Sequence, residues 1–155
     1  MCNDRSVFNA VLRHDLVSFI GKAFAMVGGG NPYKHNWHIE VMADYLIRAY
    51  NRDIKRLIIT LPPRNLKSIC ASVAFPAWAL GQDPSFRFIG ASYSADLAGK
   101  HARDCRKVME AGWYKQTFPK TRLNHRKLAE EEFETTTGGF RLSTSVGGTL
   151  TGRGG

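Results

Sequence analysis

Lys67 and Ser68 hold the most informative place in the sequence, directly after a short loop and at the start of a helical pattern. The loop follows an apolar run over 57–61 that is rich in branched residues and is typical of a buried strand. A strand, a tight loop and a helix that begins with Lys-Ser favour phosphate binding, because helix N–H groups and the helix dipole attract anions. In that chemistry Lys67 would reach the outer phosphates of a nucleotide, and the Ser68 hydroxyl would be a ligand of Mg²⁺.

The loop before Lys67 departs from the glycine-rich pattern GxxxxGK[ST]. Leu61 and Leu66 occupy the two glycine positions, and leucine enters positive φ only at a cost in free energy. We therefore expect a loop that differs from the standard phosphate cradle. The residues alone leave a second interpretation open, in which this segment is a strand–turn–helix corner with a lysine on its surface.

The hydrophobic periodicity predicts the elements that must position this loop. It indicates helices at 7–27, 38–51, 67–80 and 95–111, and buried strands at 56–61 and 86–91. Strand, helix, strand and helix in this order predict an α/β fold with a parallel sheet. Residues 113–128 show no regular pattern, whereas 133–137 and 140–146 predict two strands that Gly138-Gly139 joins as a hairpin.

Composition limits the classes of function. The 155 residues suit one domain, and a hydrophobic fraction of 43% is enough for a packed core. The formal net charge is +9, which favours polyanionic partners, either phosphate ligands or nucleic acid. The other interpretation is a basic surface that serves solubility and has no specific partner. Three widely spaced cysteines predict neither a disulfide framework nor a zinc site. We therefore expect the protein to be located in the reducing cytoplasm of a host cell. The apolar stretch over 16–27 is too short to cross a bilayer, and we expect no membrane partner.

From about Trp37 to Gly155 the chain resembles the N-terminal ATPase part of phage terminase large subunits. The last of the matching segments is the most specific. In chain order the resemblance rests on Trp37-His38, Pro62-Pro63-Arg64 with Lys67-Ser68, Phe75-Pro76-Ala77-Trp78, Ala91-Ser92-Tyr93-Ser94-Ala95, Gly138-Gly139 and the run from Thr144 to Gly154.

The resemblance implies a P-loop NTPase-type fold in three layers, with an N-terminal helical segment at 1–30 and a partial ATPase domain at 31–155. It implies ATP and Mg²⁺ as ligands. Lys67 would bind the β- and γ-phosphates, Ser68 would hold Mg²⁺, and Arg64 would sense or stabilise the γ-phosphate. The nucleotide-binding loop would comprise Pro63, Arg64, Asn65, Leu66, Lys67 and Ser68.

Two further elements take a role from the resemblance. Trp37 and His38 resemble the element on the adenine side of the nucleotide, although Trp37 also suits a plain core position. Arg153 stands where the family places an arginine shortly before its acidic strand, and it would act as an arginine finger on a neighbouring subunit's ATP. A turn arginine paired with a surface acid is the other interpretation of Arg153.

The resemblance also implies partners and an expected truncation. The intact protein would couple ATP hydrolysis to the movement of double-stranded DNA, in a ring of identical subunits that meets a small terminase subunit and a portal protein. The sequence ends at Gly155, before the strand whose carboxylates such ATPases use. We therefore expect a truncated chain that is inactive alone. The alternatives are a basic, non-catalytic fragment that binds nucleic acid, for which residues 100–127 supply a basic surface, or half of a helicase-type ATPase.

Overall fold

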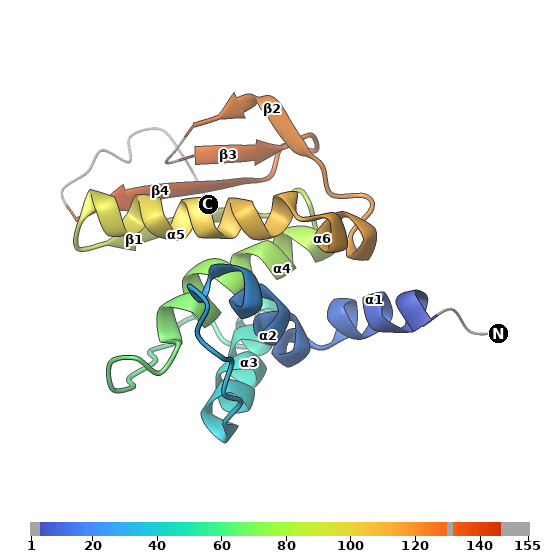
Figure 1. Cartoon of the computed structure of the whole chain (residues 1–155). Helices are drawn as coiled ribbons and strands as arrows, with labels where there is room; N and C mark the ends of the chain where they lie inside the picture. The colour runs from blue at the N-terminus through green and yellow to red at the C-terminus, as the bar shows by residue number, and fades with distance from the viewer. Residues whose placement is uncertain (1–3, 130–131, 147–155) are drawn as a thin grey trace.

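The computed structural model describes residues 4–129 and 132–146. Its elements form an α/β fold in which a helical part leads into a mixed sheet (Figure 1). The helices are α1 (Asp4–His14), α2 (Leu16–Val27), α3 (Trp37–Tyr50), the π-helix η1 (Ile69–Ala74), α4 (Phe75–Gln82), α5 (Ala95–Glu110) and α6 (Gly112–Thr117). The strands are β1 (Arg87–Ser92), β2 (Leu123–Leu128), β3 (Glu132–Thr135) and β4 (Phe140–Ser145).

The first predicted helix is two helices, because Asp15 interrupts it. The Asp15 side chain accepts hydrogen bonds from the backbone N–H groups of Val17 and Ser18, at 3.2 and 3.0 Å, and so begins α2 as an N-cap. The apolar spacing is the same on both sides of this break, which is why periodicity alone missed it. The predicted helix at 38–51 is confirmed as α3 and the one at 95–111 as α5.

The predicted strand at 56–61 is wrong. The segment is extended, but its backbone over 56–60 makes no hydrogen bond to any other described residue. In the described sheet, whose order is β1-β4-β3-β2, β1 is an edge strand, and the 56–61 segment does not pair with its open side. Leu57, Ile59 and Leu61 still pack against the core, whereas Ile58 is 91% exposed.

The sheet is mixed, not parallel throughout. β1 and β4 are parallel, and β4 runs antiparallel to β3 in the hairpin that the sequence predicted. The region at 113–128, predicted to be irregular, contains α6 and β2, which pairs antiparallel with β3. Short helices and twisted strands of this kind carry too few residues to show a period.

Within the described part of the chain, the sheet is covered on one face, so two layers replace the predicted three. Burial alternates along β3 and β4, and Phe133, Thr135, Arg141 and Ser143 are the buried members. They face the helices, since Phe133 belongs to the core built mainly from α1–α6 and η1. Ile89 on the opposite face of β1 is 37% exposed.

The helix after the 61–68 loop has a π-helical segment. Helical geometry begins at Lys67, and in η1 the N–H of Phe75 bonds to the carbonyl of Cys70, five residues back. The helix then continues as α4 to Gln82, slightly beyond the predicted end. The Ser72 carbonyl in this turn accepts a hydrogen bond from Arg141 Nη2 at 3.0 Å, so a side chain of β4 stabilises the irregular turn.

Candidate functional site

The 61–68 loop has two residues in the left-handed backbone region. Arg64 has φ = 67° and Leu66 has φ = 57°. For non-glycine residues this conformation costs about 1–2 kcal/mol each. Leu66 enters positive φ in spite of this cost and adopts the kind of backbone that a glycine would provide at that place. The packing of its side chain against the core offsets part of the cost.

Lys67 closes this loop. Its Nζ donates a hydrogen bond to the Leu61 carbonyl oxygen at 3.2 Å, across the full width of the turn. Asn65 Nδ2 donates to the carbonyl oxygens of Pro62 and Pro63, at 3.2 and 3.3 Å. Side-chain donors therefore occupy the carbonyls of the loop.

In the helical run that begins at Lys67, η1 has no side-chain cap at its start after Ser68. The N–H groups of Lys67, Ser68 and Ile69 have no acceptor among the described residues. Helices α2, α3 and α5 differ, because Asp15, Asn36 and Ser94 accept hydrogen bonds at their starts, whereas α6 also begins without a side-chain cap. Unpaired N–H groups at a helix start attract anions. Ser68 is exposed beside them.

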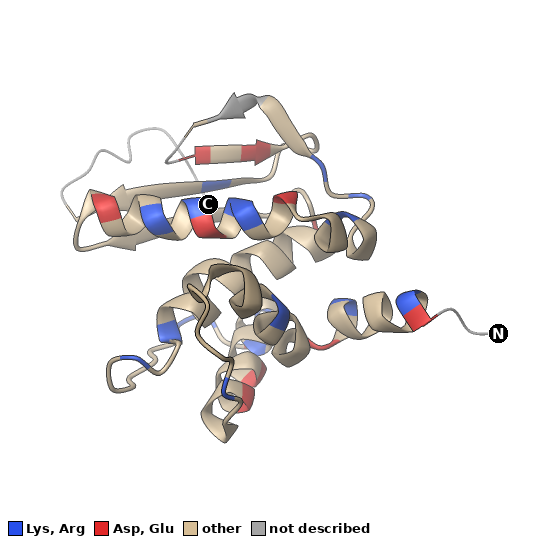
Figure 2. Cartoon of the chain, in the orientation of Figure 1, with Lys and Arg blue, Asp and Glu red and all other residues tan. Residues whose placement is uncertain are grey.

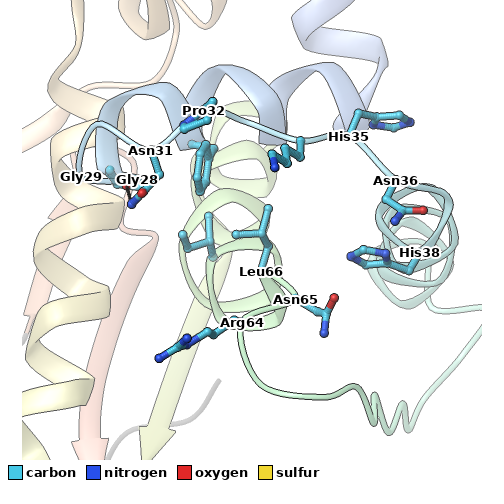
Figure 3. Close-up of a pocket in the computed structure, with 14 residues that line it drawn as sticks. Gly28, Gly29, Asn31, Pro32, His35, Asn36, His38, Arg64, Asn65 and Leu66 are labelled. Carbon is cyan, nitrogen blue, oxygen red and sulfur yellow. Dashed lines mark hydrogen bonds between the residues drawn. The ribbon is translucent and has the colours of Figure 1, made fainter.

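A cavity of about 800 Å³ lies between this loop and the segment that joins α2 to α3 (Figure 3). This volume is within the range of small-molecule sites. Its lining contains no acidic residue, and Lys34 and Arg64 contribute positive charge. In Figure 3, His38 approaches the cavity from the start of α3, and the Arg64 guanidinium points away from the cavity. The full lining is Phe24, Val27, Gly28, Gly29, Asn31, Pro32, Lys34, His35, Asn36, His38, Arg64, Asn65, Leu66 and Ile69.

The structure brings some of the predicted site residues together and separates others. His38, Arg64, Asn65 and Leu66 line the cavity, whereas Pro63, Lys67 and Ser68 do not. Trp37 is 69% exposed and lines a neighbouring hollow of about 370 Å³, together with the extended segment at 57–61. It is therefore not a core aromatic residue. Arg153 lies outside the described residues.

Sequence reasoning missed the segment 28–36 as part of a site. The run Gly28-Gly29-Gly30 indicates only the end of a helix. Gly29 and Gly30 have φ of 65° and 82°, and a Cβ on either would meet nothing within 4 Å. Glycine is therefore needed there for the backbone turn that brings Asn31 and Pro32 over the cavity, which the glycine run could have signalled.

The described residues contain no cluster of three or more His, Cys, Asp or Glu side chains that could hold a metal ion. His35 and His38 belong to no such cluster, and His35 Nε2 lies 2.7 Å from Glu40 Oε1.

The predicted basic surface on α5 is interleaved with acids (Figure 2). Lys100 Nζ lies 2.6 Å from Asp104 Oδ2, and Arg106 Nε lies 3.7 Å from Glu110 Oε1. Lys107 donates to the backbone carbonyl of Met26 at 3.2 Å. The two ion pairs offset part of the positive charge that the helix presents to a polyanion.

Among the helices of the described ranges, none combines the length and apolar composition that a membrane span requires. No protein-family model matches the chain, and no curated protein and no solved structure is significantly similar to it.

Proposed function

We propose that the 61–68 loop and the adjoining cavity bind a nucleoside triphosphate, and that the chain is the ATP-binding portion of a viral DNA-packaging motor of the terminase large-subunit class. The observation that carries the nucleotide proposal is the left-handed backbone of Leu66 directly before Lys67. Strained backbone of this kind gathers at ligand-binding sites. The uncapped helix start that follows it supports the same proposal.

The chemistry of the loop favours a polyanion. The N–H groups of Lys67, Ser68 and Ile69 are free to donate to phosphate oxygens, and the helix dipole adds positive potential at the same place. Lys67 would exchange its bond to the Leu61 carbonyl for a bond to the β- and γ-phosphates. The phosphate offers a charged acceptor in place of a neutral one, so this exchange is favourable.

The neighbouring residues take roles from their positions. Arg64 is exposed at the mouth of the loop, where it would approach the γ-phosphate. The base and ribose would occupy the cavity beside His38, with Trp37 at its outer side. Ser68 would ligate Mg²⁺, which when bound neutralises charge on the phosphates. The arginine finger assigned to Arg153 stays a proposal from the resemblance.

The motor function rests on the resemblance. In the intact protein, hydrolysis would drive double-stranded DNA, and the small terminase subunit, the portal protein and further copies of the same subunit would be the partners. The interleaved acids on α5 weigh against the alternative of a basic fragment that binds nucleic acid through that helix.

Calorimetric titration with Mg·ATP tests the nucleotide site. We expect binding to the wild-type chain and at least a tenfold loss of affinity in Lys67→Ala, because the lost bond is charge-assisted. Lys55→Ala, an exposed lysine in the loop before the extended segment, is the matched control and should bind normally. A folded wild-type chain that binds no Mg·ATP, or a Lys67→Ala variant with unchanged affinity, would overturn the assignment.

A further inference from the structure

Arg141 is a buried arginine without a carboxylate partner in the described part of the chain. It lies in β4 on the helix-facing side of the sheet and is 2% exposed. Its Nη2 donates to the Ser72 carbonyl at 3.0 Å, and its Nη1 donates to the Ser143 hydroxyl. Both acceptors are neutral, and the described ion pairs involve other residues.

Nearby groups leave the charge of Arg141 uncompensated. Burial lowers the pKa of Arg141, and the buried thiol of Cys105 is the titrating group that acts against this shift. Burial raises the pKa of Cys105 to about 11, so this thiol is neutral at pH 7. A buried charge is unfavourable unless an opposite charge accompanies it. The arrangement therefore favours an anion beside the guanidinium.

A small polar pocket meets Arg141 at this point. Its volume is about 240 Å³, and it lies between η1, the edge strand β1 and the first turns of α5. Ser72, Ser92 and His101 line it together with Arg141. A side chain at Gly90 would come within 3.3 Å of Arg141 Nη2, so glycine keeps this side of the pocket open.

The charges around His101 also favour an anion in this pocket. His101 is 8% exposed, and burial together with Arg141 and Lys100 lowers its pKa. Asp104, the one acid that favours its charged form, is held by Lys100 at 2.6 Å. An anion in the pocket would favour the protonated form of the His101 ring, which would then donate a hydrogen bond to the anion beside the Arg141 guanidinium.

We propose that this pocket binds a small oxyanion of the phosphate class, held by the Arg141 guanidinium and the His101 ring, with the Ser72 and Ser92 hydroxyls beside it. Arginine suits such a ligand because its planar fork matches two oxygens of a phosphate group. The site is separate from the 61–68 loop, since the two cavities share no residue. It does not rest on the proposed nucleotide function.

Thermal unfolding with millimolar sodium phosphate, against sodium chloride of equal ionic strength, tests the proposal. At tenfold excess over the dissociation constant we expect the wild-type Tm to rise by roughly 3–6 °C. The rise should persist in Lys67→Ala, which removes the other phosphate candidate, and should be absent in Arg141→Met. No rise in the wild type, or a rise lost in Lys67→Ala and kept in Arg141→Met, would overturn it.

A second measurement does not depend on the folding of Arg141→Met. The His101 ring resonances of the wild type, assigned by comparison with His101→Gln, should shift saturably on titration with phosphate, and unmoved resonances would contradict the site. Glycerol 2-phosphate identifies the source of the phosphate group. A shift with inorganic phosphate alone supports a free anion, and an equal shift with the ester supports a phosphate ester in the same site.

Discussion

Lys67 Nζ donates its hydrogen bond to the carbonyl oxygen of Leu61, the residue at which the extended segment ends. The contact joins the two ends of a loop in which Arg64 and Leu66 both have positive φ. The same ammonium group thus stabilises the loop in the absence of ligand and is the group assigned to the phosphates. In the nucleotide complex that we propose, the ammonium group would exchange this bond for one to a phosphate oxygen or share its donors between the two, so a bound polyanion would compete with a stabilising contact.

Arg64 allows the backbone strain of this loop to be measured. Its side chain is exposed, so Arg64→Gly and Arg64→Ala both remove little packing. Only glycine adopts φ = 67° without steric cost, and Arg64→Gly should be the more stable variant by about 1 kcal/mol, after the larger chain entropy of unfolded glycine is included. Urea denaturation gives the difference in the free energy of unfolding. An alanine variant at least as stable as the glycine variant would contradict a left-handed Arg64.

Gly138 and Gly139, in the turn between β3 and β4, should differ in their tolerance of alanine. A Cβ on Gly139 would lie 2.3 Å from the Pro84 carbonyl oxygen, so the backbone itself would have to move. A Cβ on Gly138 meets nothing within 4 Å, and its cost comes only from φ = 87°. We expect Gly139→Ala to lower the free energy of unfolding by about 2–3 kcal/mol and Gly138→Ala by about 1 kcal/mol. Urea unfolding midpoints measure both, and equal losses would refute the close approach at Gly139.

His101 should make stability depend on pH. Its folded pKa lies below the ordinary value of 6.5, so the unfolded chain binds more protons than the folded chain as the pH falls through that value. The free energy of unfolding should therefore fall from pH 7.5 towards pH 5.5, in buffers without phosphate. His101→Gln should flatten this slope, whereas His14→Gln, at an exposed position of α1, should keep it. Identical slopes in the wild type and His101→Gln would exclude His101 as the source.

The sequence predicted the elements whose own residues determine them. The helices at 38–51 and 95–111, the strand at 86–91 and the hairpin at Gly138-Gly139 are confirmed, because each has a clear period or a turn signal. The segment at 56–61 shows the limit. Its apolar residues alternate in exposure, with Ile58 outward and Leu57 and Ile59 against the core, but a strand also needs a neighbour for its backbone groups, and this segment has none among the described residues.

The site was predictable to a similar degree. Lys67 and Ser68 stand out by type and spacing, and the structure places them at the uncapped start of a helix. The cavity beside them depends on the chain reversal at 28–36, where the glycine run signals a turn but not what the turn lies over. Arg141 could not be distinguished from a surface arginine, because its burial follows from the pairing of β4 between β1 and β3.

The π-helical turn η1 has a consequence for changes in chain length. A helix that closes hydrogen bonds over five residues holds one residue more than an α-helical turn does. Removing one residue within 69–74 would convert this turn to α-helical geometry and leave the flanking turns in phase with their own contacts. The same deletion in the middle of α5 would instead rotate Cys105 and Val108 out of the core. Of these two helices, the one that follows Lys67 can therefore lose a residue while its later turns keep the same side chains in the core.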